Sequence, residues 1–160
     1  MSFTMKLPAE LEKESVDAAV RAVLERDTFQ LYPESATSIP VLKFSDALRT
    51  NLFYAKSLGD IVLGYEVIEK ALSNELHGLR KVACPTDRVS RLLLVTNDGA
   101  PRFYRELEFL QRKQGTRVLI CRLDIDSAKM AEVLGCAGRV VKAVLLNRKR
   151  SVVNVLKSLL

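Results

Sequence analysis

The sequence predicts an α/β domain built in three layers, an α/β/α sandwich with a four-stranded sheet and an extra helix at the N-terminus. Two observations support this prediction. From residue 61 onwards short apolar runs alternate with amphipathic stretches, and strands that are apolar on both faces need helices on both sides of the sheet. The chain has 160 residues, of which 48% are hydrophobic, and this is enough for one continuous core.

The first part of the chain, residues 1–42, is predicted to be an arm attached to a domain of residues 43–160. Residues 8–26 show an apolar stripe at helical spacing, and Pro8 suits the first turn of such a helix. Residues 27–40 contain prolines and a cluster of Ser and Thr, which favours a linker. The acidic face and the apolar stripe of the helix suit packing onto the domain or onto a partner.

Within residues 43–160 the pattern predicts helices and strands in alternation. Ser45 is expected to cap a first helix that ends near Gly59. The expected strands are 61–63, 91–96, 116–122 and 140–146. The later helices are expected from Tyr65 to about Leu76, from Pro101 onwards, from a cap at Ser127 to Gly135, and over 152–160.

Positive charge is concentrated in the predicted domain. The whole chain has a net charge of +6, but residues 1–40 hold four Lys or Arg against seven Asp or Glu, which leaves +9 on residues 41–160. A basic body behind an acidic arm fits a polyanionic partner, most often nucleic acid. A basic protein without such a partner is the alternative, and charge does not decide between the two.

The sequence contains no arrangement of residues typical of an enzyme or of a metal site. His77 is the single histidine, and Cys84, Cys121 and Cys136 are too widely spaced for a zinc site or a disulfide framework. Cys121 lies in an apolar run and is expected in the core. No P-loop, GxGxxG or GxSxG motif occurs. We therefore expect no catalysis, no cofactor, no metal and no small-molecule substrate.

Local structure explains the remaining acidic turns, and the apolar runs do not indicate a membrane segment. Residues 124–126 (Asp-Ile-Asp) are expected to serve as a helix cap, and 97–99 (Asn-Asp-Gly) as a turn before Pro101. No apolar run reaches the roughly 18 residues of a membrane-spanning helix, and the acidic N-terminus differs from a signal or transit peptide. We expect a cytoplasmic, nuclear or nucleolar protein without a membrane partner.

Three segments, taken in order, resemble a known family. They are LFYAKSLGDIVLGYEVIEKAL (52–72), RLLLVTNDGAP (91–101) and MAEVLGCAGRVVKAVLL (130–146). Together they are similar to the kink-turn-binding ribosomal-protein superfamily, also called the pelota-like fold, which includes ribosomal proteins, small nucleolar RNP proteins and RNase P subunits. The resemblance covers about residues 45–150. It implies a three-layer α/β/α sandwich with a four-stranded mixed sheet.

The resemblance also implies where RNA would bind. In the family a helix that begins at a glycine, here Gly64, faces the RNA, and a second contact comes from the loop after the short helix. Where the family commonly has Asn, Glu and Lys, this chain has Glu66, Val67 and Lys70, so only the lysine matches. The RNA-binding residues implied are Gly64, Tyr65, Glu66, Val67, Lys70, Gly135, Cys136, Ala137, Gly138 and Arg139.

The chemistry of these residues agrees in part with that role. A helix N-terminus offers unpaired N–H groups to phosphate, and Gly64 allows close approach of the backbone. Lys70 and Arg139 supply positive charge. The alternatives are an ion pair of Lys70 with Glu66, a solvated Arg139, and a simple turn at 136–138.

The connection 77–90 is longer than is usual in the family. It carries Arg80, Lys81 and Arg88, and Arg91 follows just beyond it. The connection is either a solvated insertion or an additional contact to RNA or protein.

Three functions remain as hypotheses. The first is a non-catalytic RNA-binding protein, a subunit of a ribosome or other ribonucleoprotein particle, which binds a kinked or internal-loop RNA beside other proteins of that particle. The second is a protein–protein interaction module on the same fold that has lost RNA binding. The third, a small enzyme or the nucleic-acid-binding domain of one, is disfavoured because no catalytic set is visible.

Overall fold

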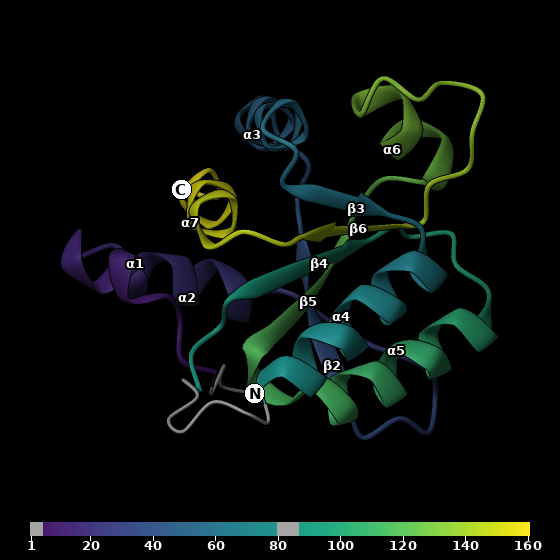
Figure 1. Cartoon of the computed structure of the whole chain (residues 1–160), viewed down its shortest axis with the longest axis horizontal. Helices are drawn as coiled ribbons and strands as arrows, with labels where there is room; N and C mark the ends of the chain where they lie inside the picture. The colour runs from purple at the N-terminus through teal and green to yellow at the C-terminus, as the bar shows by residue number, and fades with distance from the viewer. Residues whose placement is uncertain (1–4, 80–86) are drawn as a thin grey trace.

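The apolar strands of this chain assemble into one mixed sheet with helices on both faces (Figure 1). The computed structural model describes residues 5–79 and 87–160. The strands are β1 (Thr28–Gln30), β2 (Ser38–Leu42), β3 (Ile61–Leu63), β4 (Arg91–Val95), β5 (Val118–Leu123) and β6 (Ala143–Leu146). The helices are α1 (Ala9–Lys13), α2 (Asp17–Arg26), α3 (Asp46–Ser57), α4 (Tyr65–Leu79), α5 (Pro101–Gln114), α6 (Ser127–Val133) and α7 (Lys149–Lys157), with a 3₁₀ turn at Gly115–Arg117.

The strand order is β1-β2-β5-β4-β6-β3, with β1 and β3 at the two edges. Strands β2, β5 and β4 run parallel, whereas β6 runs antiparallel to both of its neighbours, β4 and β3. Because β3 and β6 are antiparallel, the residues that follow β3 lie at the same end of the sheet as the residues that precede β6. The antiparallel pairing therefore brings the loop after β3 and the loop before β6 together.

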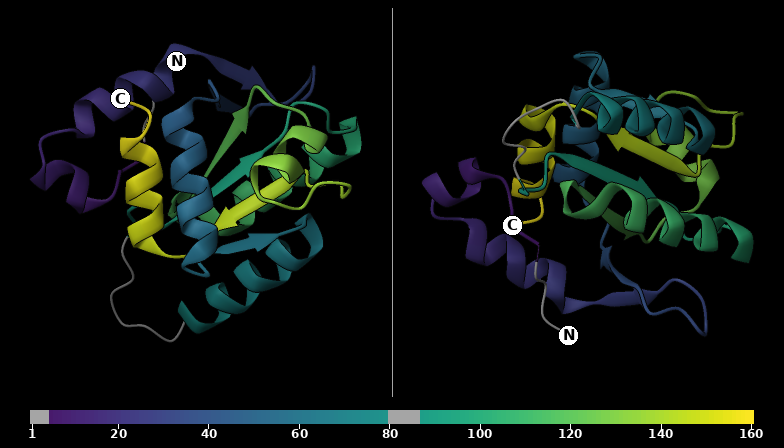
Figure 2. Two further views of the ribbon diagram at one scale, coloured as in Figure 1. Left: turned by 90° about the horizontal axis from the view of Figure 1, so that it is seen from above. Right: turned by 60° about the horizontal axis from the view of Figure 1, so that its bottom comes forward.

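Alternate residues of the central strand β4 face opposite sides of the sheet. Leu92 and Leu94 belong to the core beneath α2, α3 and α7, and Leu93 and Val95 belong to the core beneath α4 and α5. The views in Figure 2 show the same division, with α4 and α5 together on one face. Helices on both sides of a buried sheet were predicted from the sequence, and this prediction is confirmed.

Over the described residues the sheet has six strands, so the prediction of four is wrong. The two additional strands, β1 and β2, arise largely from residues 27–40, for which the sequence favours a linker. The strand β2 contains Pro40, and a proline normally speaks against a strand. Here β2 pairs with β5 only from Val41 onwards, so the missing N–H of Pro40 removes no hydrogen bond to that neighbour.

The N-terminal segment forms two helices, so the prediction of a single helix over 8–26 is wrong in its middle. The chain turns at Ser15, whose φ is 59°, and α2 begins two residues later. A serine is an uncommon residue at positive φ, so the sequence carries little signal for this break. The turn lets Leu11 of α1 and both Val20 and Leu24 of α2 reach one core, and the helices therefore pack onto the sheet domain.

Most helix ends lie where the local signals predict them. The side chain of Ser45 accepts a hydrogen bond from a backbone N–H in the first turn of α3, and Gly59, with a φ of 75°, follows the end of that helix. The cap of α6 is Asp126, one residue before the predicted Ser127. Ser127 instead donates from its N–H and its hydroxyl to the carboxylate of Asp98, because Asp98 lies close by in the loop that follows β4.

Candidate nucleic-acid interface

The two segments implied in RNA binding, residues 64–70 and 135–139, lie at the same end of the sheet (Figure 1). The first follows β3, and the second lies in the connection between α6 and β6. Leu63 is opposite Val144 in the antiparallel pair, and the N–H of Gly64 donates to the carbonyl oxygen of Ala143 at 3.2 Å. The connection that leads into β6 therefore passes beside the start of α4.

The first turns of α4 present exposed side chains at this end. Gly64 has a φ of 88°, and its carbonyl oxygen accepts a hydrogen bond from the N–H of Ile68 at 3.0 Å, so the chain passes directly from β3 into the helix. Ile68 is fully buried, which fixes the rotation of the helix. As a result Glu66, Val67 and Lys70 are exposed to solvent.

Tyr65 is already engaged in the fold. Its hydroxyl donates to the carbonyl oxygen of Glu106 at 3.1 Å, and its ring meets the ring of Phe103 edge-on, with centroids 5.6 Å apart. Burial, followed by the nearby carboxylates, raises the pKa of Tyr65 to about 12. The side chain thus holds α4 against α5, and its hydroxyl stays protonated over the physiological range.

The second segment consists of tight turns that follow α6. Gly135 and Gly138 have φ values of 71° and 91°. The N–H of Cys136 donates to a carbonyl oxygen in α6 at 2.7 Å, and the N–H of Arg139 donates to the carbonyl oxygen of Cys136 at 3.1 Å. Cys136 is half-buried, whereas Ala137, Gly138 and Arg139 are exposed.

Lys56 of α3 contacts the start of the second segment, and nothing in the sequence indicated this role. Its ammonium group donates to the carbonyl oxygen of Leu134, at the end of α6, across a sequence separation of 78 residues. A side chain at Gly135 would place its Cβ 3.4 Å from the Lys56 nitrogen. The sequence of α3 gives no local sign of this contact, because the contact depends on how α3 and α6 pack.

The two cations of the interface are available for a partner. Lys70 and Arg139 are exposed, and neither side chain has a hydrogen-bond or ion-pair partner among the described residues. The ion pair between Lys70 and Glu66, considered from the sequence, is therefore not formed. Both cations are unpaired among the described residues, although the exposed carboxylates of Glu66 and Glu69 lie on the same turns of α4 and offset their charge.

Among the cations of the connection 77–90, Arg88 is the described one, and it is occupied by contacts within the fold. Arg80 and Lys81 lie outside the described residues. Arg88 donates to the carbonyl oxygen of Leu7 at 2.9 Å and pairs with the carboxylate of Glu12 at 2.8 Å. These contacts attach the end of the connection to the N-terminal segment.

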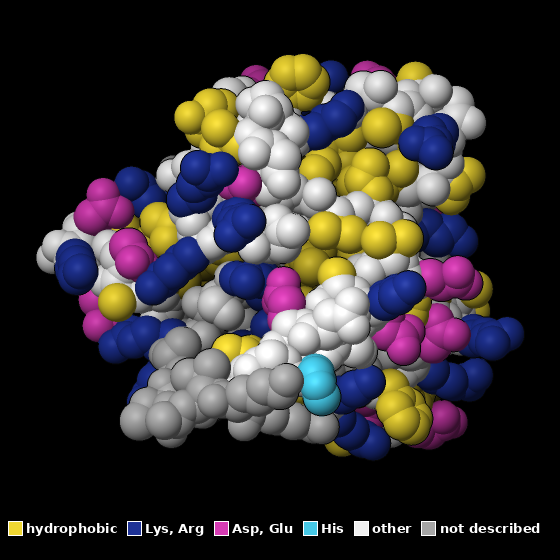
Figure 3. Space-filling view, viewed as in Figure 1, with side chains coloured by type: hydrophobic (Ala, Val, Ile, Leu, Met, Phe, Trp, Pro, Cys, Tyr) yellow, Lys and Arg dark blue, Asp and Glu magenta, His cyan; other side chains and the backbone are white. Residues whose placement is uncertain are grey.

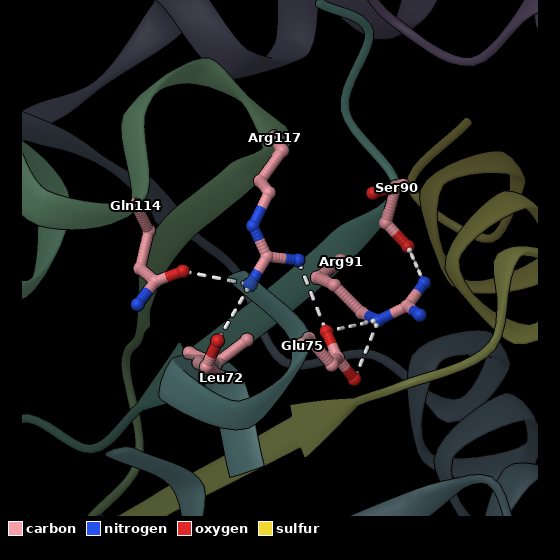
Figure 4. A network of polar contacts seen from close by, with 6 residues as sticks. All are labelled: Leu72, Glu75, Ser90, Arg91, Gln114 and Arg117. Atoms are coloured by element: carbon pink, nitrogen blue, oxygen red, sulfur yellow. Dashed lines mark hydrogen bonds and ion pairs between the residues drawn. The ribbon is translucent and has the colours of Figure 1, made fainter. Parts of the chain in front are cut away.

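Arg91 belongs to a polar network at the opposite end of the sheet (Figure 4). Its guanidinium and that of Arg117 share the carboxylate of Glu75, at 3.1 and 3.0 Å. Arg117 also donates to the carbonyl oxygen of Leu72 at 3.0 Å and to the side-chain oxygen of Gln114 at 2.7 Å. Arg91 is therefore a structural residue, occupied by its contact with Glu75.

Within residues 5–79 and 87–160 no group of three or more His, Cys, Asp or Glu could hold a metal ion, and no helix is long and apolar enough to span a bilayer. Cys121 is buried, as predicted, and its burial raises the pKa of the thiol. Cys84 lies outside the described residues.

Gly64 is predicted to be required for the turn into α4. Replacing it with alanine should cost about 1–2 kcal/mol in the free energy of unfolding, because an L-residue is strained at its φ of 88° although the space around it is free. Gly78→Ala is the matched control, since Gly78 lies in α4 without positive φ and the change should stabilise slightly. Urea denaturation measures both. Equal effects of the two substitutions would show that the turn does not need glycine.

Comparison with known proteins adds information about the fold. No family model matches the chain, and no curated protein matches it. A solved structure of a protein with unknown function from Bacillus halodurans is similar, with a TM-score of 0.53 and 11% sequence identity, over 72% of this chain and 98% of that chain. At this level of identity the likeness is one of fold alone.

Proposed function

We propose that this protein is a divergent member of the kink-turn-binding superfamily and that it binds structured RNA, without catalysis, as a subunit of a cytoplasmic or nuclear ribonucleoprotein particle. The proposed contact surface consists of residues 64–70 and 135–139 and is called the glycine edge below. The proposal rests on the meeting of two segments that turn at glycines with positive φ. Each segment has an exposed cation without a hydrogen-bond or ion-pair partner among the described residues.

The groups of the glycine edge suit an RNA backbone. Gly64 and Gly138 have exposed backbone that a phosphate or a base can approach closely. Lys70 acts as a point charge, and the forked guanidinium of Arg139 fits a phosphate or the edge of a guanine. The charge of +9 on residues 41–160 supports the attraction at longer range.

A second candidate function, a protein–protein interaction module, is favoured by two apolar side chains at the same edge. Val67 is 59% exposed and Val140 is 72% exposed. An apolar partner surface would cover both. The absorbance of the purified protein at 260 nm separates the two functions, because only an RNA-binding protein copurifies with nucleic acid.

The proposed function predicts different effects for the two cations. Lys70→Ala should weaken the binding of all RNAs alike and reduce the slope of log affinity against log salt by about 1, since lysine neutralises one phosphate. Arg139→Ala should cost about 1–3 kcal/mol if the guanidinium reads a base, and the difference between cognate and non-cognate RNA should then narrow. Fluorescence anisotropy with a hairpin that carries a kinked internal loop, and with a fully paired hairpin, measures both effects.

Lys43→Ala is the control for this experiment. Lys43 is exposed, has no partner among the described residues and follows β2, far across the sheet from β3. If the parent protein does not bind either hairpin at about 50 mM salt, the proposed function is wrong. If Lys70→Ala and Arg139→Ala bind like Lys43→Ala while Arg80→Ala abolishes binding, the RNA site lies in the connection 77–90.

A further inference from the structure

A second group of cations lies at the other end of the edge strand β3. There a hollow of about 420 Å³ is lined by the loop after α3 and by the start of α7. The residues that line it are Leu58, Gly59, Asp60, Arg148, Lys149 and Arg150. We call it the basic hollow. Figure 3 shows Lys and Arg side chains gathered on this part of the face, around the start of α7.

The carboxylate in the basic hollow does not balance its cations. Asp60 is bound to Arg150 by two hydrogen bonds, at 2.7 and 3.0 Å, and is 1% exposed. Lys149 pairs with Glu10 at 3.2 Å in an exposed position. Arg148 is exposed and has no hydrogen-bond or ion-pair partner among the described residues, and after the hydrogen bond from Arg150 its charge also contributes to the lowered pKa of Asp60. Counting Glu10, three cations face two carboxylates, which leaves one positive charge in excess.

An exposed aromatic ring lies in the helix that leads into the basic hollow. Tyr54 of α3 is 52% exposed. Its carbonyl oxygen accepts a hydrogen bond from the N–H of Leu58 at 3.1 Å, so the ring lies one helical turn before the residues that line the hollow. Arginine side chains next to an exposed aromatic ring are typical of surfaces that hold a nucleic-acid strand, in which phosphates meet the cations and a base stacks on the ring.

The basic hollow and the glycine edge lie at opposite ends of the paired strands β6 and β3. Asp60 precedes this three-residue strand and Gly64 follows it. At about 3.3 Å per residue the two ends are roughly 13 Å apart, a distance that a few nucleotides span. β3 is an edge strand, so no further strand of the described residues separates the two groups of cations.

We propose that RNA bound at the glycine edge continues along β3 and that its phosphates bind Arg148 and Lys149 in the basic hollow. This inference rests on the proposed function and adds a second contact region outside the segments that the sequence implied. Arg148 contributes an unpaired guanidinium, and Lys149 contributes an ammonium group that exchanges Glu10 for phosphate. Arg150 stays with Asp60 and positions the start of α7.

The test compares two double variants that remove the same charge. Arg148→Ala/Lys149→Ala should reduce the slope of log affinity against log salt by about 1–2, because each lost phosphate contact contributes about 0.7–0.9. Arg26→Ala/Lys43→Ala removes two exposed cations beside β1 and β2, at the opposite edge of the sheet, and should leave the slope unchanged. The probe is the hairpin with the kinked internal loop, with stems long enough to extend past the loop on both sides.

The outcomes separate the inference from the proposed function. If Lys70→Ala and Arg139→Ala weaken binding while Arg148→Ala/Lys149→Ala binds like the control, the inference is overturned and the glycine edge stands. If only Arg148→Ala/Lys149→Ala weakens binding, the basic hollow stands and the glycine edge is wrong. If an acidic peptide without nucleotides binds the hollow and the RNA does not, a protein partner replaces RNA and the inference fails.

Discussion

Glu75→Ala is expected to destabilise the protein by about 3 kcal/mol, because the substitution leaves the buried guanidinium of Arg117 without its counter-charge. The side chain of Arg117 is 8% exposed and that of Glu75 is 28% exposed, so the ion pair is largely shielded from water. The Nε of Arg117 is already buried without a partner among the described residues. A second unsatisfied group on the same guanidinium adds to that cost.

Thermal unfolding should show the loss clearly. For a chain of this size a loss of about 3 kcal/mol lowers the Tm by about 6–12 °C. Glu69→Ala, which removes an exposed carboxylate from the same helix, should change the free energy of unfolding by less than about 0.5 kcal/mol. If Glu75→Ala and Glu69→Ala have the same small effect, the network of Figure 4 does not stabilise the fold.

Asp60→Asn is expected to lower the free energy of unfolding by about 2 kcal/mol at neutral pH, since hydrogen bonds to a charged group are among the stronger ones. The carboxylate of Asp60 accepts two hydrogen bonds from Arg150 and one from the buried hydroxyl of Ser151 at 2.6 Å. It joins the start of β3 to the start of α7, across 90 residues of sequence. An asparagine side chain keeps the size but offers one oxygen and no charge.

The same variant should change how stability depends on pH. The hydrogen bond from Arg150, together with the one from Ser151, holds the pKa of Asp60 below its ordinary value. A carboxyl group with a lowered folded-state pKa stabilises fully above its unfolded pKa, about 4, and loses this contribution as pH falls through the folded pKa. The parent should therefore lose stability below about pH 4, and Asp60→Asn should lose less.

Asp27→Asn, which changes an exposed carboxylate after α2, is the control for this pH series. It should keep the decline of the parent at acid pH. An Asp60→Asn curve parallel to that of the parent would show that Asp60 does not contribute to the acid sensitivity. The affinity of Asp60→Asn for RNA should increase, although its stability falls, because the loss of the carboxylate increases the positive charge of the basic hollow.

The sequence by itself predicted those parts of the fold that are encoded over a few residues. The apolar runs predicted as strands at 91–96 and 116–122 form the buried strands β4 (Arg91–Val95) and β5 (Val118–Leu123), and the spacing of apolar residues after Pro101 is that of α5. Caps and stops were predicted where the residue type is restrictive, as at Ser45 and Gly59. Such signals depend on hydrogen bonds and periodicities within one element, so they can be recognised without knowledge of the fold.

Short strands, breaks and charge partners were decided by tertiary structure. β1 has three residues and no apolar alternation of its own, and it exists as a strand because β2 pairs with it. The break at Ser15 depends on where the core lies relative to α1 and α2. Local propensity is too weak to specify either feature against tertiary packing.

For the candidate site too, the sequence predicted one part and the tertiary structure decided the other. The residues of the glycine edge were implied by the order of motifs, but their meeting depends on the antiparallel pairing of β3 with β6. The run Arg148-Lys149-Arg150 is visible in the sequence, yet its position beside Asp60 is a contact across 90 residues. Charge composition therefore indicated a polyanionic partner. Only the packing of α7 against the end of β3 brought the second group of cations onto the same edge. The physical reason is that contacts between residues distant in sequence form only when the sheet is complete.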